Sequence, residues 1–193
     1  MNQVKLEQIK TKVKQVLNPK RYEHTMGVMY TAGALAMRYN EDLYKALFAG
    51  ILHDCAKGFP ESALLSLAQA FRLSITEVER KNPGLLHAKV GAHLARKEYG
   101  IADAYIIDAI SCHTTGRPNM TLLDKIIYVA DYMEPNRSEA PNLDEIRRLA
   151  FEDIDACLYT ILESTVAYLK QKDAVIYPMT EETYLYYKKE WNK

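Results

Sequence analysis

The sequence predicts an all-α fold. Apolar residues recur at three- and four-residue spacing along most of the 193 residues, and no alternating stretch is long enough to form a sheet. Prolines and glycines fall between the periodic segments, where they end helices. No linker or low-complexity stretch divides the chain, so we expect a single domain that spans residues 1–193.

Three helices are expected before residue 60. Residues 2–17 carry apolar side chains at helical spacing. Residues 20–39 add a run of small side chains, which permits close packing between helices. Residues 41–57 form the most apolar helix of the three, and Gly58 and Pro60 stop it.

The rest of the chain repeats the same pattern. Pro83 and the glycine after it interrupt the periodicity, and Thr121 is a suitable N-cap for the helix that follows it. Residues 142–170 are long enough for one helix or two, and residues 173–179 are expected to be a loop or a short extended piece. The expected helices occupy residues 61–71, 76–81, 86–99, 102–112, 122–133, 142–170 and 181–191.

The last of these helices is aromatic. Tyr184, Tyr187 and Trp191 form a stripe that either packs on the protein's own core or covers a second copy in a homodimer. We expect packing on the core, and a homodimer is the alternative.

Composition excludes several classes of partner. Lys plus Arg and Asp plus Glu number 25 each, so the chain has no excess of positive charge that would favour binding to nucleic acid. No apolar run approaches the ~18 residues that span a membrane, and the polar amino terminus lacks the apolar core of a signal peptide. The 3 cysteines are odd in number and unpatterned, which fits a reducing compartment. We therefore expect a soluble cytoplasmic protein with neither a nucleic-acid nor a membrane partner.

The most informative stretch is residues 46–58, where an apolar run ends in His53 and Asp54. A carboxylate that enters a core unpaired is costly, and a metal ion is the partner that also accounts for the adjacent imidazole. Lys57 lies one helical turn further on and is expected to face the same way. An anionic substrate at the metal would therefore meet a cation.

Further ionisable residues occupy positions where the helical pattern calls for apolar ones. Each alone is more readily a core histidine bonded to a carbonyl, a helix-capping aspartate or, for Asp54 and Lys57, a local surface pair. Their joint occurrence in one chain argues against coincidence, whereas His93 and the cysteines are interpreted as structural. The additional candidates are His24, His87, His113 and Asp131.

Mixed His and Asp ligation without cysteine suits iron, manganese, cobalt or zinc. Such an ion lowers the pKa of a bound water from ~15.7 toward ~7, which supplies hydroxide near neutrality. His87 and His113 could bind a second ion ~3.5–4 Å away with Asp54 as the bridge, or donate hydrogen bonds to phosphate. Lys57, Arg21 and Arg137 are the candidates for binding phosphate charge. The primary candidate ligands are His24, His53, Asp54 and Asp131.

Four segments carry a resemblance to a known family. The order His24, His53-Asp54, Asp131 resembles the signature of the HD-domain metal-dependent phosphohydrolases, and the fuller segments resemble their YqeK-type branch, the symmetrical diadenosine tetraphosphate hydrolases. The resemblance implies a helical HD bundle with the metal site between helices, a bound iron centre, and cleavage of dinucleoside polyphosphates into two nucleoside diphosphates. The segments are RYEHT at 21–25, HDCAKG at 53–58, CHTTG at 112–116 and ADYMEPNR at 130–137.

These residues and the resemblance together predict which side chains are catalytic and which bind the substrate. His53, Asp54 and Lys57 are the candidate catalytic residues. A carboxy-terminal loop is expected to contact the nucleoside, although Tyr177 stands there where relatives carry His. The other candidate substrate-binding residues are Arg21, His24, His87, His113, Asp131 and Arg137, and those of the loop are Ala174, Val175, Ile176, Tyr177, Pro178 and Met179.

Two alternatives stay open from the sequence. The first is an HD-type phosphohydrolase acting on mononucleotides, and the second is a non-catalytic nucleotide-binding HD module. A module that had lost catalysis would be expected to lack a ligand or a phosphate-facing cation, and neither the ligand quartet nor Lys57 is missing. The sequence therefore favours the hydrolase acting on diadenosine tetraphosphate.

Overall fold

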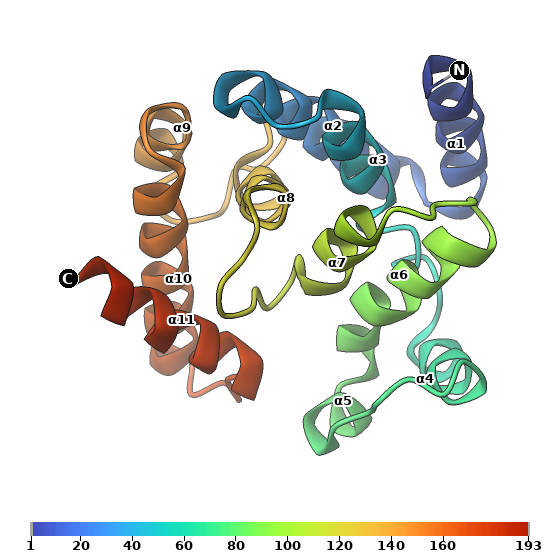
Figure 1. Cartoon of the computed structure of the whole chain (residues 1–193). Coiled ribbons are helices and arrows are strands. Elements are labelled where there is room, and N and C mark those ends of the chain that lie inside the picture. Colours follow the sequence, from blue (N-terminus) through green and yellow to red (C-terminus); the bar gives the residue numbers. More distant parts are fainter. Residues whose placement is uncertain (1, 193) are drawn as a thin grey trace.

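The predicted all-α fold is confirmed. A computed structural model describes residues 2–192, and within that range every regular element is a helix (Figure 1). The elements are α1 (Asn2–Val16), α2 (Pro19–Tyr39), α3 (Leu43–Leu52), α4 (Glu61–Ala70), α5 (Glu77–Lys81), the short 3-10 helix η1 (Pro83–Leu86), α6 (His87–Lys97), α7 (Ala104–Cys112), α8 (Leu122–Met133), α9 (Leu143–Glu152), α10 (Ile154–Gln171) and α11 (Pro178–Trp191).

One expected helix is shorter than predicted, and the difference matters for the site. The helix predicted over residues 41–57 ends at Leu52, and His53 is its C-cap. The chain then turns, with Cys55 N–H donating to Leu52 O and Lys57 N–H donating to Asp54 O. Gly58 completes the turn at a point where a Cβ would meet Val16 O. His53 and Asp54 therefore lie in a tight turn rather than on one face of a helix.

The long carboxy-terminal segment forms two helices, which was one of the two expectations. Asp153 separates α9 from α10 with extended backbone at φ −147°. Its side chain accepts hydrogen bonds from the N–H groups of Asp155 and Ala156, so it caps α10. The final helix begins at Pro178, earlier than the predicted residue 181, because proline suits the first turn of a helix.

The site depends on close packing of α2, α3, α7 and α8. Gly50 of α3 lies against the backbone of Met29 in α2, where any side chain would collide, so glycine permits these two helices to cross closely. A second, smaller apolar cluster joins α4 to η1 and α6. Large side chains buried in the main core are Met29, Leu35, Ile51, Leu52, Ile110, Leu123, Ile126 and Ile127.

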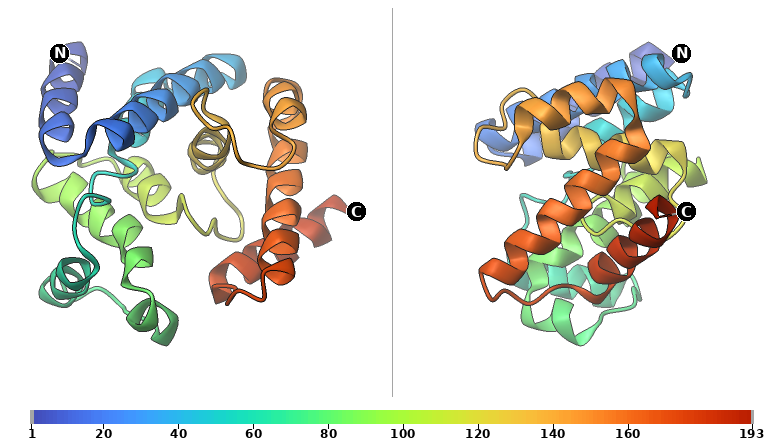
Figure 2. Two further views of the ribbon diagram at one scale, coloured as in Figure 1. Left: turned by 180° about the vertical axis from the view of Figure 1, so that it is seen from behind. Right: turned by 90° about the vertical axis from the view of Figure 1, so that its left-hand side faces the viewer.

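The carboxy-terminal helices α10 and α11 lie against each other, next to α8 and α9 (Figure 2). Tyr187 is 8% exposed and its hydroxyl accepts a hydrogen bond from Met120 N–H, while Tyr184 packs against the core. Packing of the aromatic stripe on the core is therefore confirmed for these two residues. Trp191 is exposed and stacks on Tyr159. None of the helices in residues 2–192 has the length and apolarity to cross a membrane.

Candidate metal centre

Asp54 lies at the centre of a buried polar cluster and uses both carboxylate oxygens. Its Oδ2 is 2.9 Å from Arg21 Nη1 and 3.6 Å from His53 Nε2. Its Oδ1 faces the opposite way, 3.3 Å from His87 Nε2 and 3.6 Å from His113 Nε2. One carboxylate thus joins two groups of imidazoles.

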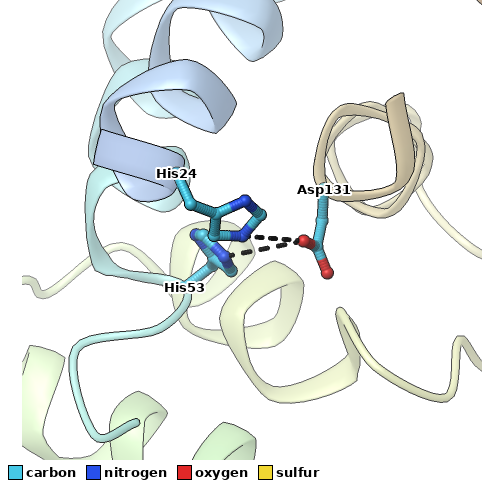
Figure 3. Close-up of side chains that lie close together, drawn as sticks. All are labelled: His24, His53 and Asp131. Carbon is cyan, nitrogen blue, oxygen red and sulfur yellow. Dashed lines mark ion pairs between the residues drawn. The ribbon is translucent and has the colours of Figure 1, made fainter. Parts of the chain in front are cut away.

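The second carboxylate, Asp131 of α8, closes one of these groups. Its Oδ1 lies 3.1 Å from His24 Nε2 and 3.9 Å from His53 Nε2, and Figure 3 shows both rings turned toward it. His24 Nε2 is also 4.0 Å from Asp54 Oδ2. Four side chains from α2, the α3 turn and α8 therefore converge as the sequence predicted. The ligand atoms of His24, His53 and Asp131 lie within 4.8 Å of one another, and so do those of His53, Asp54 and His113.

Three of the histidines are oriented by their own chain. In each, Nδ1 contacts the carbonyl three residues earlier, and because a carbonyl only accepts, Nδ1 holds the hydrogen and the Nε2 lone pair points into the cluster. Two of these carbonyls lie in the last turns of α3 and α7, where helical partners run out. The distances are 2.7 Å for His53 to Gly50, 2.6 Å for His87 to Gly84 and 2.7 Å for His113 to Ile110.

Glu134 orients the fourth histidine and was missed in the sequence. Its Oε1 lies 3.0 Å from His24 Nδ1, and its Oε2 accepts a hydrogen bond from Asn136 N–H. Glu134 is buried, and Gly27 makes room for it because a Cβ there would collide with Oε2. A carboxylate behind an imidazole is the usual way to orient a metal-binding histidine. Its position directly after the apolar helix α8 was the available signal.

The cluster has the properties of a metal site. The Nε2 atom of His53 is fully buried and has no hydrogen-bond partner in the described part of the chain, whereas His24 Nε2 is buried with only the Asp131 carboxylate beside it. A buried polar atom without a partner is costly, so a cation between these atoms would relieve the cost. Nearby Cys55 is turned away toward Gly91 O, and burial raises its pKa to about 12. The donor set is therefore imidazole and carboxylate, as predicted.

Electrostatics keep His53 neutral and Asp54 ionised. Burial lowers the pKa of His53 to about 4, although Asp54 and Asp131 partly oppose this. Burial disfavours ionised Asp54, but His53, His113 and His87 outweigh that cost and hold its pKa well below the ordinary value. His53 is thus already in the state that binds a metal ion.

Two other histidines attract protons when no cation offsets the carboxylates. Burial disfavours the charged form of His24, but Asp131 and Glu134 outweigh it and raise its pKa. Burial likewise opposes charge on His113, and Asp54 raises its pKa. The Nε2 atoms of His87 and His113 lie only 3.3 Å apart, so a proton or another cation must separate their lone pairs.

The three predicted phosphate-binding cations surround the cluster. Arg21 contacts Asp54, and Arg137 Nη2 lies 2.9 Å from Asp131 Oδ1, with both side chains partly exposed. Lys57 is exposed in the turn after α3, and its Nζ lies 3.3 Å from His87 Nδ1. His93, interpreted as structural, stacks on Phe71 outside the cluster.

A cavity of about 750 Å³ opens beside the cluster. Arg21, His24 and Arg137 line it at one end, and Tyr168 of α10 contributes to its wall. The loop between α8 and α9 supplies most of the remaining wall, and Figure 2 shows this loop between α2 and the α9–α10 pair. Residues 174–179 do not line the cavity, so their contact with substrate stays a prediction.

Comparisons with known proteins agree with this geometry. The HD domain family matches residues 21–136. The chain is 45% identical over 172 residues, 89% of this chain and 91% of the relative, to a protein of Bacillus subtilis named "Bis(5'-nucleosyl)-tetraphosphatase, symmetrical". A protein of the same name from Staphylococcus aureus is 36% identical over 184 residues, 94% of each chain.

A solved structure is similar over nearly the whole chain. It is described as a predicted HD superfamily hydrolase involved in NAD metabolism from Clostridium acetobutylicum. The TM-score is 0.91 with 39% identity, and the match covers 95% of this chain and 97% of the other.

Proposed function

This chain belongs to the HD-domain family, and from that membership we propose that it hydrolyses diadenosine tetraphosphate symmetrically into two ADP molecules. The observation that supports this best is the double role of Asp54, whose Oδ2 lies beside His53 and whose Oδ1 lies beside His87 and His113. Two adjacent cation positions suit a phosphoanhydride, because charge must be offset on both the attacked phosphate and the leaving one.

The primary metal ligands in this proposal are His24, His53, Asp54 and Asp131. Their fit rests on the buried His53 Nε2 atom without a partner, on the convergence of His24 and His53 on Asp131, and on the donor set without thiolate. When bound, a divalent ion supplies an acidified water and offsets phosphate charge. Iron is the proposed native metal, and manganese, cobalt or zinc are the alternatives. His87 and His113 would hold a second ion across Asp54.

The cations around the cluster are proposed to hold the phosphates. Arg21 and Arg137 each pair with a proposed ligand carboxylate, so both guanidinium groups lie beside the proposed metal site, where they would bind phosphate oxygens. Lys57 adds a point charge beside His87. Together these side chains can hold one diphosphate half against the cluster while its outer phosphate faces His53 and Asp54.

Two finer parts of the proposal concern the carboxy-terminal third of the chain. Residues 174–179 are proposed to contact the nucleoside, supported by their place a few residues after Tyr168, which lines the cavity. A homodimer would use the exposed face around Trp191. Sedimentation of wild-type protein and of Trp191→Ala tests the homodimer, which predicts dissociation of the variant.

Product analysis tests the proposed function. Metal-free protein is incubated with diadenosine tetraphosphate and iron(II), manganese, cobalt or zinc, and the nucleotides are separated by chromatography. The expected result is ADP as the only first product. Equal amounts of AMP and ATP would contradict the symmetrical cut, and an absence of turnover with every metal would contradict the hydrolase.

A further inference from the structure

The cavity beside the metal cluster is lined by two arginines of the site and by one tyrosine from another part of the chain. Arg21 and Arg137 enter it where they contact the carboxylates of the cluster. Among the described residues that line this cavity, Tyr168 is the one Phe, Tyr or Trp side chain, and the His24 imidazole belongs to the metal cluster. A ligand whose phosphates reach the arginines therefore finds one large aromatic ring outside the metal cluster.

Tyr168 is available to a ligand. Its side chain is 50% exposed. Lys172 Nζ lies 5.9 Å from the centroid of the Tyr168 ring, near the outer limit for a cation–π contact. A flexible lysine at that distance can move aside for a flat base.

The size of the cavity matches a nucleotide half of the substrate. Binding pockets for small molecules occupy about 300–1,000 Å³, and this one measures about 750 Å³. It is also formed by parts of the chain that lie far apart in sequence, namely the start of α2, the α8–α9 loop and the last part of α10. Such a cavity can receive a diphosphate at one end and its base at the other.

We propose that Tyr168 is the stacking platform for one adenine of the substrate, and that it sets the preference for dinucleoside over inorganic polyphosphates. This inference rests on the proposed function, because it names the residue that binds the nucleoside. A base stacked on an aromatic side chain contributes roughly 1–3 kcal/mol, which is about a 5- to 150-fold difference in affinity. The stacked half would have its phosphates at Arg21 and Arg137.

Ligand binding to four variants tests the proposal without requiring catalysis. The dissociation constants of ADP and of inorganic pyrophosphate are measured calorimetrically for manganese-loaded wild type, Tyr168→Ala, Tyr168→Phe and Tyr30→Ala. Tyr30 is the control, because it is similarly exposed, at 60%, on α2 but does not line the cavity. Tyr168→Ala is expected to weaken ADP binding about 5- to 150-fold and to leave pyrophosphate unchanged. Tyr168→Phe and Tyr30→Ala should match wild type.

Kinetics separate this inference from the proposed function. With diadenosine tetraphosphate, Tyr168→Ala should raise KM by the factor seen for ADP and change kcat by less than about twofold, because stacking is equal in ground and transition states. Unchanged ADP binding in Tyr168→Ala, or equal weakening of ADP and pyrophosphate, overturns the inference while wild-type hydrolysis stands. Selective loss of ADP binding without hydrolysis by wild type supports the stacking role and overturns the proposed function.

Discussion

Two parts of the cluster orient their histidines in different ways. His53, His87 and His113 are held by carbonyls three residues earlier, so each is oriented wherever its own helix end forms. His24 is held by Glu134, which lies 110 residues further along the chain. The first arrangement needs only local structure, whereas the second needs α2 and the end of α8 to pack correctly.

The two ways of orienting a histidine have different consequences for metal binding. The locally held imidazoles direct their lone pairs toward Asp54 without help from distant segments, because their N–H groups donate to carbonyls that include those left over at helix ends. His24 is correctly oriented for the primary site only when Glu134 packs against α2, and this packing requires the absence of a side chain at Gly27. We therefore expect substitutions near His24 to lower metal affinity only partly. Substitution of Asp54 should disrupt the metal contacts of all the histidines around it.

Asp54→Ala should have the largest effect. Both groups of imidazoles lose their shared carboxylate, so bound metal should disappear and activity should fall at least about a thousandfold. Helical content should be largely retained, which circular dichroism checks. Elemental analysis of the purified variant provides the test, and full metal occupancy would refute the assignment of Asp54 as a ligand.

Glu134→Gln should reduce metal affinity by about 10- to 100-fold, the range typical for a partner behind a ligating histidine. Gly27→Ala should act in the same direction, because its Cβ displaces the Glu134 carboxylate. Metal titration by competition with a chromophoric chelator measures both. If both variants bind metal like wild type, His24 is not oriented through Glu134.

The raised pKa values of His24 and His113 predict proton release on metal binding. Burial opposes their charged forms, but the neighbouring carboxylates outweigh it, so both keep a proton to higher pH than an ordinary histidine. Metal must displace these protons, so affinity should fall by about tenfold for each histidine as pH drops one unit below its raised pKa. Calorimetry in buffers of different ionisation enthalpy measures the release, and identical affinity at pH 6 and pH 8 would contradict it.

Lys57→Met should have the smallest effect. The substitution keeps the apolar stem and removes a charge that lies exposed at the edge of the cluster. Loss of roughly 1 kcal/mol should raise KM about fivefold and leave metal content intact. Wild-type kinetics at low ionic strength would remove Lys57 from the substrate-binding residues.

Much of this arrangement follows from the sequence because ionisable residues interrupt an apolar pattern. His24, Asp54 and Asp131 each stand at a position that packing would assign to an apolar side chain, and they do converge. The turn at 53–58 was not predicted, because the apolar pattern continues past Leu52, where the helix ends, and the approach of Gly58 to Val16 of α1 is not visible in the sequence. Glu134 was missed because a glutamate at a helix end is usually solvated.

Tyr168 illustrates the same limit in the substrate cavity. In sequence it is one aromatic residue near the end of a long helix, and nothing local relates it to Arg21 or to the α8–α9 loop. Only the fold brings these segments around one cavity. The segment predicted to contact the nucleoside, residues 174–179, was placed by family resemblance alone and awaits its own test.

Isotope labelling tests symmetrical cleavage most directly. Diadenosine tetraphosphate is hydrolysed by the metal-loaded protein in water enriched with oxygen-18, and the products are analysed by mass spectrometry before any second turnover. The account predicts ADP alone, with one label on the β-phosphate of half of the ADP molecules, because water attacks a central phosphate and the other half departs with the bridging oxygen. AMP and ATP as first products, with the label in either, would contradict it.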